Sequence, residues 1–273
     1  MARDLDAFAK TVWDYYRAHG RHDLPWRLPR HGGHFDPYKI MVSEIMLQQT
    51  QVPRVLPKFA VFTAQFPTFA ALADAPLGDV LQAWSGLGYN RRAKFLWQAA
   101  QMVQQEFGGE VPQTVAELVK LPGIGPNTAG AVLAYSFNKP VMFIETNIRT
   151  VFIHHFFGDD TSVHDRDIAD LVAQTVPDNA REWYWALMDY GTFLKQTVGN
   201  LNRNSAHYTV QSKFEGSRRQ IRGKVLRTLG TGAATEGQLA QSIADERLQA
   251  VLTDLLAEGL VQRQGAYYKL PGA

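Results

Sequence analysis

Apolar residues recur every three or four positions through most of this chain. Leu5, Phe8 and Val12 follow that spacing between charged residues, which predicts an amphipathic helix over about residues 5–16. Across 37–194, short stretches of the same pattern alternate with prolines and glycines, and strand-like alternation is scarce. The pattern therefore predicts an essentially all-α body built from short helices.

The pattern changes near the C-terminus. A helix is predicted over 218–229, and a helix pair follows at 236–243 and 246–258. Residues 259–270 hold two short runs of strand-forming residues separated by a glycine turn, which predicts a two-stranded hairpin. Three helices and a hairpin of this size predict a winged-helix domain at 217–273.

Length and composition are those of a globular protein. The 273 residues suit about two domains, so a larger domain is expected at 1–216. Apolar residues make up 45% and charged residues 20%, and no apolar stretch is long enough to span a bilayer. The first residues carry no apolar export signal, which favours a cytoplasmic protein. The sequence has no cysteine, which excludes disulfides, cysteine-ligated metal sites and a cysteine nucleophile.

Basic charge is concentrated locally, although the formal net charge is only +2. Residues 195–227 include eight lysines and arginines and a single acid, Glu215. Such a segment favours contact with a polyanion such as DNA. The candidate DNA-contacting residues in it are Lys195, Arg203, Arg218, Arg219 and Arg222.

The strongest local motif is a two-glycine hairpin between predicted helices, Leu-Pro-Gly-Ile-Gly-Pro-Asn-Thr-Ala at 121–129. Its glycines leave backbone N–H groups open beside a helix N-terminus, a geometry that binds phosphate through N–H donors and the helix dipole. An ordinary tight turn is the alternative interpretation. A monovalent cation is also compatible with the hairpin. The candidate phosphate-binding residues are Gly123, Ile124, Gly125, Asn127 and Thr128.

Two glutamates are candidate acid–base groups. Glu44 lies among apolar residues of a helix predicted to begin at Asp36-Pro37, and burial there is expected to raise its pKa. Glu145 follows an apolar run at the start of another predicted helix. One protonated and one ionised carboxyl group are what hydrolysis of an N-glycosidic bond requires. The alternatives are that Glu44 pairs with a basic residue and that Glu145 interacts with the helix dipole.

Further residues suit a protein that takes a base out of a DNA stack. Gln48 and Gln49 lie at the end of the predicted Glu44 helix, which is expected to run to about Thr50, and are able to fill the gap that a displaced base leaves. Tyr89 lies on a glycine-rich loop beside Arg91 and Arg92, an aromatic wedge next to two cations. A solvated glutamine pair and an ordinary surface loop are the alternatives. The histidines lack metal-ligand spacing, so no metal site is expected.

These motifs match one family in order and spacing. The matching segments are Leu24-Pro-Trp-Arg27, Tyr38, Ser43 to Val52, Gly86-Leu-Gly-Tyr89, the hairpin at 121–129, and Asn147. They resemble the helix-hairpin-helix DNA glycosylases, and within them the adenine DNA glycosylases of the MutY type. The resemblance covers about residues 8–195. It implies an all-α fold with one lobe at about 30–140, a second formed by 1–29 and 141–216, and DNA bound between them.

The resemblance also implies residue roles in the chemistry. Glu44 would protonate the adenine, Glu145 takes the place of the family's catalytic aspartate, and Asn147 takes that of its polar neighbour. Asn127 stands where the bifunctional relatives carry a Schiff-base lysine. A monofunctional enzyme that uses water as the nucleophile is therefore expected.

For the base itself, the resemblance implies that Gln49 and Tyr89 enter the stack and that Arg27 helps line the base pocket. Trp185 belongs to the same pocket but replaces a Gln or Glu that contacts adenine in the family. Glu145 is also a departure, because one extra methylene displaces a carboxylate by about 1 Å.

Two larger segments depart from the family. The basic, polar segment 195–216 replaces the four-cysteine iron–sulfur loop, so neither a cluster nor another cofactor is expected. The winged helix replaces the family's Nudix-like domain. Its recognition helix is acidic, which favours a protein partner at least as much as DNA.

The sequence thus predicts a monomeric, nucleoid-associated cytoplasmic DNA N-glycosylase that needs no metal. Its substrate would be double-stranded DNA with a damaged or mismatched base, with adenine in a mispair favoured. The alternatives are a mismatch- or lesion-binding protein that has lost catalysis through the changes at 145 and 185, and a glycosylase for a different base. A winged-helix transcription regulator is the third, and the acidic helix argues against it.

Overall fold

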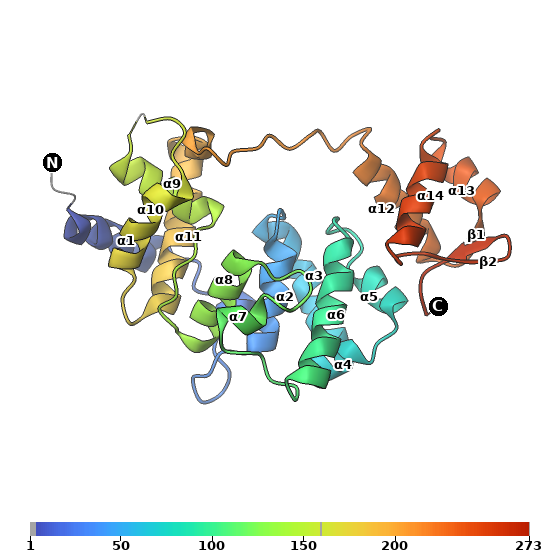
Figure 1. Ribbon diagram of the computed structural model, residues 1–273, viewed down its shortest axis with the longest axis horizontal. Coiled ribbons are helices and arrows are strands. Elements are labelled where there is room, and N and C mark those ends of the chain that lie inside the picture. Colours follow the sequence, from blue (N-terminus) through green and yellow to red (C-terminus); the bar gives the residue numbers. More distant parts are fainter. Residues whose placement is uncertain (1–3, 159, 273) are drawn as a thin grey trace. The chain divides into compact units, whose positions relative to one another are not determined.

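The computed structural model describes residues 4–158 and 160–272. They form helices joined by loops, with three short strands near the C-terminus (Figure 1). No helix in this part of the chain is long and apolar enough to cross a membrane. The chain folds into two compact units. Unit 1 takes its described residues from 4–41, 113–119 and 124–210, and unit 2 from 42–112, 120–123 and 211–272.

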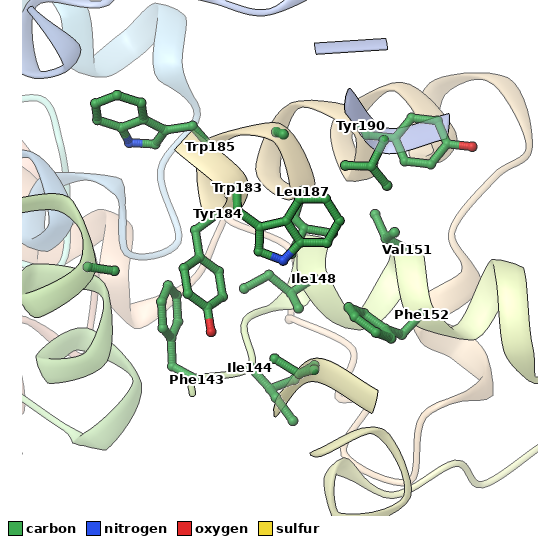
Figure 2. Packing of buried hydrophobic residues seen from close by; sticks show 14 of the residues in the cluster. Phe143, Ile144, Ile148, Val151, Phe152, Trp183, Tyr184, Trp185, Leu187 and Tyr190 are labelled. Carbon is green, nitrogen blue, oxygen red and sulfur yellow. The ribbon is translucent and has the colours of Figure 1, made fainter. Parts of the chain in front are cut away.

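Unit 1 is organised around the helix α11, Ala180–Thr197. This helix packs against α1 (Leu5–His19), α8 (Pro126–Phe137) and α9 (Thr146–Phe156). Its buried aromatic residues fill the space between the helices: the rings of Tyr184 and Phe143 lie 4.1 Å apart (Figure 2). The shorter elements of this unit are η1 (Pro25–Arg27), α7 (Val115–Leu118), α10 (Asp165–Thr175) and η2 (Leu201–Asn204).

Unit 2 begins inside α2, which runs from Pro37 to Leu47. Its central helix α6 (Arg91–Glu106) packs against α4 (Phe69–Ala73) and α5 (Leu77–Ala83), and α3 (Val52–Gln65) also contacts α5. The side chains of Phe62, Trp84 and Leu96 are fully buried in this part of the unit.

Residues 217–272 form the C-terminal module of unit 2. It contains α12 (Arg218–Leu229), α13 (Glu236–Ile243) and α14 (Leu248–Ala257). Its antiparallel sheet has the order β1 (Ala234–Thr235), β3 (Tyr267–Lys269), β2 (Gln262–Gln264), and Tyr268 is paired with Ala234 on one side and Arg263 on the other.

Local sequence explains where several helices start. The Asp36 carboxylate accepts a hydrogen bond from the Tyr38 N–H at 3.1 Å, and Pro37 is the first residue of α2, as predicted. Thr235 and Gln238 cap each other at the start of α13. The predicted all-α character is confirmed.

Two predictions for the C-terminal module are wrong in detail. The helix expected at 246–258 begins only at Leu248, because the Asp245 carboxylate accepts the Arg247 N–H and holds a turn there. The expected two-stranded hairpin gains a third strand, because β1 pairs with β3. The winged-helix designation of this module stays a prediction.

The two units divide the chain differently from the predicted lobes and C-terminal domain. The reason on the C-terminal side is that the module docks on α5: the Gly78 N–H donates to the Pro271 carbonyl at 2.7 Å, and Gln82 donates to the carbonyl of Gly230. On the other side, α8 packs with α11 and so belongs to unit 1. The predicted domain boundaries stay a prediction.

The closest helix approach in unit 1 yields a stability prediction. A Cβ placed on Gly191 of α11 would lie 2.8 Å from the Asn147 Cβ and would meet the Asn147 carbonyl. Gly191→Ala should therefore lower the free energy of unfolding by about 1–3 kcal/mol, because overpacking a tight contact forces backbone shifts. The measurement is urea denaturation. The control is Gln196→Ala, an exposed position of the same helix, expected within about 0.5 kcal/mol of wild type. Equal stability of both variants would contradict the prediction.

Candidate functional site

Glu145 lies immediately before α9, as its N-cap residue, and its side chain is half-buried. The preceding residue is held by Asn127, whose amide donates to the Ile144 carbonyl at 2.8 Å and accepts from the Ile144 N–H at 3.4 Å. Burial raises the pKa of the Glu145 carboxyl group, and the charge of Arg149 offsets part of that rise. This carboxyl group therefore holds its proton to higher pH than an ordinary glutamate.

The surroundings of Glu145 are themselves fixed. Arg149, one turn later on α9, donates to both carboxylate oxygens of Asp165 at 2.6 and 2.8 Å. Asn147 is half-buried against the helix α11 at Gly191. The structure thus brings the predicted residues Glu145, Asn127 and Asn147 together in unit 1.

Arg27 and Trp185 also meet in unit 1. The buried Arg27 guanidinium donates two hydrogen bonds to the Asp189 carboxylate, at 2.8 and 2.9 Å, and lies 5.3 Å from the Trp185 ring centroid. The Trp185 ring is buried and stacks on Tyr135 at 5.8 Å. Burial would raise the pKa of Asp189, but hydrogen bonds and charge from Arg27 and Arg21 outweigh it and lower the pKa.

The ion pair with Asp189 limits the hydrogen bonds that Arg27 can donate to a base, and Trp185 limits them further. Asp189 engages both terminal nitrogens of Arg27 inside unit 1, and because it also pairs with Arg21 the three side chains together keep one positive charge. Trp185 presents an aromatic surface where the family's Gln or Glu would present hydrogen-bonding atoms. The place of Arg27 and Trp185 in a base pocket stays a prediction.

Glu44 belongs to unit 2, on α2. Its side chain is half-buried, and its neighbours Ser43 and Ile45 are buried. The helix ends at Leu47, and Gln49 follows with a left-handed backbone, φ 55°. Glu44 therefore lies about one helix turn from the end of α2, close in sequence to the exposed Gln49.

The DNA contact of Arg92 stays a prediction, and the structure shows which groups hold this side chain inside unit 2. Its buried guanidinium donates to the carbonyls of Ile45 at 2.8 Å and Met46 at 3.0 Å, at the end of α2, and to that of Gln48. It also donates to the Gly88 carbonyl at 3.2 Å in the glycine loop. Burial lowers its pKa to about 10, which leaves it charged at neutral pH. Arg92 ties these two backbone segments together through its terminal nitrogens.

Tyr89 and Gln49 lie together at the rim of a pocket of about 790 Å³ within unit 2. Tyr89 is half-buried and has a left-handed backbone, φ 48°. Gln211 donates to the Gln49 side-chain oxygen at 2.9 Å and also to the Tyr89 hydroxyl. Arg219 donates to the same hydroxyl at 2.5 Å. The two residues predicted to enter a base stack are thus neighbours.

The remaining arginines differ in what engages them. Arg222 is largely buried in a bidentate ion pair with Glu258, and its predicted phosphate contact stays a prediction. Arg218 pairs with Asp254 at 2.5 Å, but both side chains are about half exposed. Arg91 is exposed, with its Nε 3.7 Å from Glu258. Two acids of the predicted recognition helix region, Asp254 and Glu258, therefore face the basic helix α12 within the module.

The two glycines of the predicted phosphate-binding hairpin differ in backbone conformation and in surroundings. Gly123 has φ +80°, and a Cβ there would lie 2.9 Å from the Phe95 Cβ, so both backbone and space require glycine. Gly125 is exposed and is the N-cap of α8, which has no side-chain cap hydrogen bond. Ile124 is buried and contributes only its backbone to the surface, while Thr128 is half-buried. Phosphate or cation binding here stays a prediction.

The iron–sulfur cluster of the resembling family does not fit residues 195–216. Cluster ligands are thiolates, and this sequence has no cysteine. The described residues contain no group of three His, Cys, Asp or Glu side chains that could hold a metal ion. The segment is fixed by Asn202 instead, which donates to the Thr150 hydroxyl at 2.6 Å and the Thr146 carbonyl at 3.2 Å. Lys195 and Arg203 remain exposed on it.

Sequence reasoning missed Asp189, which holds Arg27, and also Arg149 and Asn202, which fix the first turns of the helix that follows Glu145. No local signal identifies them. Asp189 lies 162 positions from Arg27, and Asn202 lies 52 positions from Thr150. Gln211 was missed as well, and only its position in the basic segment pointed to it.

Known proteins resemble this chain over most of its length. Residues 42–174 match the model of the HhH-GPD superfamily base excision DNA repair protein. The adenine DNA glycosylase of Mycolicibacterium smegmatis is 34% identical over 267 residues, which cover 90% of this chain and 89% of that protein. That of Buchnera aphidicola subsp. Baizongia pistaciae is 36% identical over 192 residues, or 68% of this chain. A solved structure of a thermostable thymine-DNA glycosylase gives a TM-score of 0.60 at 26% identity, covering 68% of this chain and 85% of that one.

This chain therefore belongs to the HhH-GPD superfamily of base excision DNA repair proteins. The predicted family is confirmed, and the matched residues include the two-glycine hairpin at 121–129. The chain spans about half the length of the Buchnera relative, 52%, and most of the length of the Mycolicibacterium one.

The charge next to Glu145 yields a prediction. Arg149→Met removes the positive charge that lowers the pKa of Glu145, so this pKa should rise further. The measurement is a carboxyl-carbon NMR titration of glutamate-labelled protein. Arg166→Met is the control, because Arg166 is exposed on α10 and pairs only loosely with Asp167, at 3.6 Å. A fall of the Glu145 pKa in Arg149→Met would contradict the assigned cause.

Proposed function

We propose that this protein is a monofunctional adenine DNA glycosylase that acts on a base flipped from mispaired double-stranded DNA. The observation that carries the proposal is the similarity to an adenine DNA glycosylase over 90% of this chain and 89% of the relative. The two glutamates support it, since each of them is half-buried at one end of a helix.

In the proposed reaction, Glu44 gives a proton to the base while the C1′–N bond breaks and its electron pair leaves with the base. The ionised Glu145 carboxylate stabilises the resulting sugar cation. Water then adds to C1′, and its proton passes to a carboxylate or to solvent. Asn127 supports water as the nucleophile, because its amide is not nucleophilic and is already used to hold Ile144.

Contact with DNA is part of the proposal. Exposed cations that are not buried in ion pairs, such as Lys195 and Arg203, suit the phosphate backbone. The hairpin at 121–129 supplies backbone N–H groups next to the start of α8. The proposed enzyme is a monomer that needs no cofactor and acts at the nucleoid. The C-terminal module is proposed to bind either DNA or a protein partner.

A second candidate function is suggested by Trp185. Its buried ring, stacked on Tyr135, offers no hydrogen-bonding amide to adenine. This favours either a glycosylase for a different base or a mismatch-binding protein without catalysis. Single-turnover assays on duplexes with adenine, uracil, thymine or hypoxanthine opposite each base distinguish the three. A binding protein shifts the duplex but never produces an alkali-labile site.

Removing the proposed acid is the first test. Glu44→Gln should lower single-turnover base release by at least about 100-fold, because general acid catalysis contributes roughly 10²–10⁴-fold. DNA affinity should stay within about threefold of wild type. The matched control is Glu106→Gln, an exposed glutamate at the end of α6 in the same unit. Full activity of Glu44→Gln would refute the assignment.

The pH dependence tests the role of Glu145. The carboxylate must be ionised, and burial raises its pKa, so base release should rise with pH through that raised pKa and fall as pH drops below it. Arg149→Met should move this rising limb to higher pH, by the same amount as the NMR titration shows, and Arg166→Met should not. A limb that stays in place while the Glu145 pKa moves would show that another group controls it.

A further inference from the structure

Tyr89 and Gln49 share an unusual backbone. Both are non-glycine residues in the left-handed region, with φ 48° and 55°. Such conformations persist only where the surrounding structure holds them, and they cluster at functional sites. Other side chains must therefore hold Tyr89 and Gln49 in these conformations.

The side chain of Arg92 holds the backbone next to both Gln49 and Tyr89. The Arg92 guanidinium donates to the carbonyl of Gln48 and to that of Gly88 at 3.2 Å, the residues that immediately precede Gln49 and Tyr89. The same guanidinium lies 5.4 Å from the Tyr89 ring centroid. The two backbone positions are therefore fixed relative to each other.

The segment that leads into the C-terminal module holds the side chains of Gln49 and Tyr89. Gln211 donates to the Gln49 oxygen at 2.9 Å and to the Tyr89 hydroxyl. Arg219 of α12 donates to that hydroxyl at 2.5 Å and lies 5.6 Å from the ring centroid. It also donates to the Ser212 carbonyl at 2.6 Å. Two guanidinium groups, those of Arg92 and Arg219, therefore lie close to the Tyr89 ring.

The position of Arg219 is set by how the module is attached. Glu258, which follows α14, forms a bidentate ion pair with Arg222 of α12, and its carbonyl accepts a hydrogen bond from Lys94 of α6 at 2.5 Å. At the other end of the module, the Pro271 carbonyl accepts the Gly78 N–H. Because α12 is fastened to the helix that starts two residues after Tyr89, Arg219 cannot move freely away from the ring.

We infer that Arg219 is a positioning residue for Tyr89, and that the C-terminal module acts in base flipping by holding this aromatic wedge in the orientation that enters the DNA stack. The inference rests on the proposed function. A wedge that is already held loses less conformational freedom on insertion than a free tyrosine. Half-buried Arg219 also keeps its charge at the pocket rim, where its contact with the Ser212 carbonyl can be exchanged for a DNA phosphate.

A double-mutant cycle tests the inference. Arg219→Met removes the donor, Tyr89→Phe removes the hydroxyl that accepts it, and the third variant carries both changes. The readout is the fluorescence of 2-aminopurine placed in the mismatch, at saturating protein, which rises when the base unstacks. Single-turnover base release is measured on the same duplexes. Lys224→Met, on the same helix, is the control for loss of one positive charge.

Arg219→Met is expected to lower both unstacking and base release about tenfold at saturation. The double variant should lose no more activity than the more impaired of the two single variants. Arg219→Lys, which keeps a donor, should recover part of the loss. On a duplex whose target base lies opposite an abasic site, the loss should shrink, because that base is already weakly stacked. A merely structural role of Arg219 would lower release equally on both duplexes.

Three results would overturn the inference. One is Arg219→Met behaving like Lys224→Met at saturation. Another is faster unstacking in Arg219→Met, which would mean that Arg219 restrains the ring from DNA. The third is fully independent effects of Arg219→Met and Tyr89→Phe. If unstacking depends on Arg219 but no substrate releases a base, the positioning role stands and the proposed hydrolysis fails.

Discussion

The buried guanidinium of Arg92 determines where the candidate DNA-contacting loops of unit 2 lie. The last carbonyls of a helix have no partners within that helix, and each buried polar group left unpaired costs about 1–3 kcal/mol. Arg92 satisfies the carbonyls of Ile45 and Met46 at the end of α2, and its charge suits the negative end of the helix dipole. Since it also binds the Gly88 carbonyl, the helix that carries Glu44 and the loop that carries Tyr89 depend on one side chain.

The same chemistry explains why the basic residues of this chain cannot all serve DNA. A guanidinium that is buried must be paired, and three of the arginines singled out from the sequence are consumed in this way: Arg27 by Asp189, Arg92 by carbonyls, Arg222 by Glu258. Buried arginines stabilise the units, while exposed cations such as Arg203 stay free to release counterions from DNA. Local charge therefore overstates the number of phosphate contacts.

The sequence was sufficient for features that neighbouring residues decide. Asp36-Pro37 starts α2, Gly123 allows the hairpin to turn, and the apolar period marks the helices, because each depends on contacts within a few residues. It was insufficient for long-range partners. Nothing next to Arg27 reveals that Asp189 will pair with it, and nothing in the two residues of β1 reveals that β3 will pair with them. The distinction between a buried arginine and a DNA-contacting one depends on the fold, so patterns of charge could not make it.

The cysteine-free segment has a consequence for the chemistry of unit 1. An iron–sulfur cluster would fix such a segment through its own ligands, independently of the rest of the fold. Here Asn202 fixes it by binding the Thr146 carbonyl and the Thr150 hydroxyl, which belong to the first turns of α9. That helix begins directly after Glu145. The segment that carries the exposed Arg203 and the candidate catalytic carboxylate therefore depend on the same end of α9, which hydrogen bonds from one asparagine hold where the family uses a metal cluster.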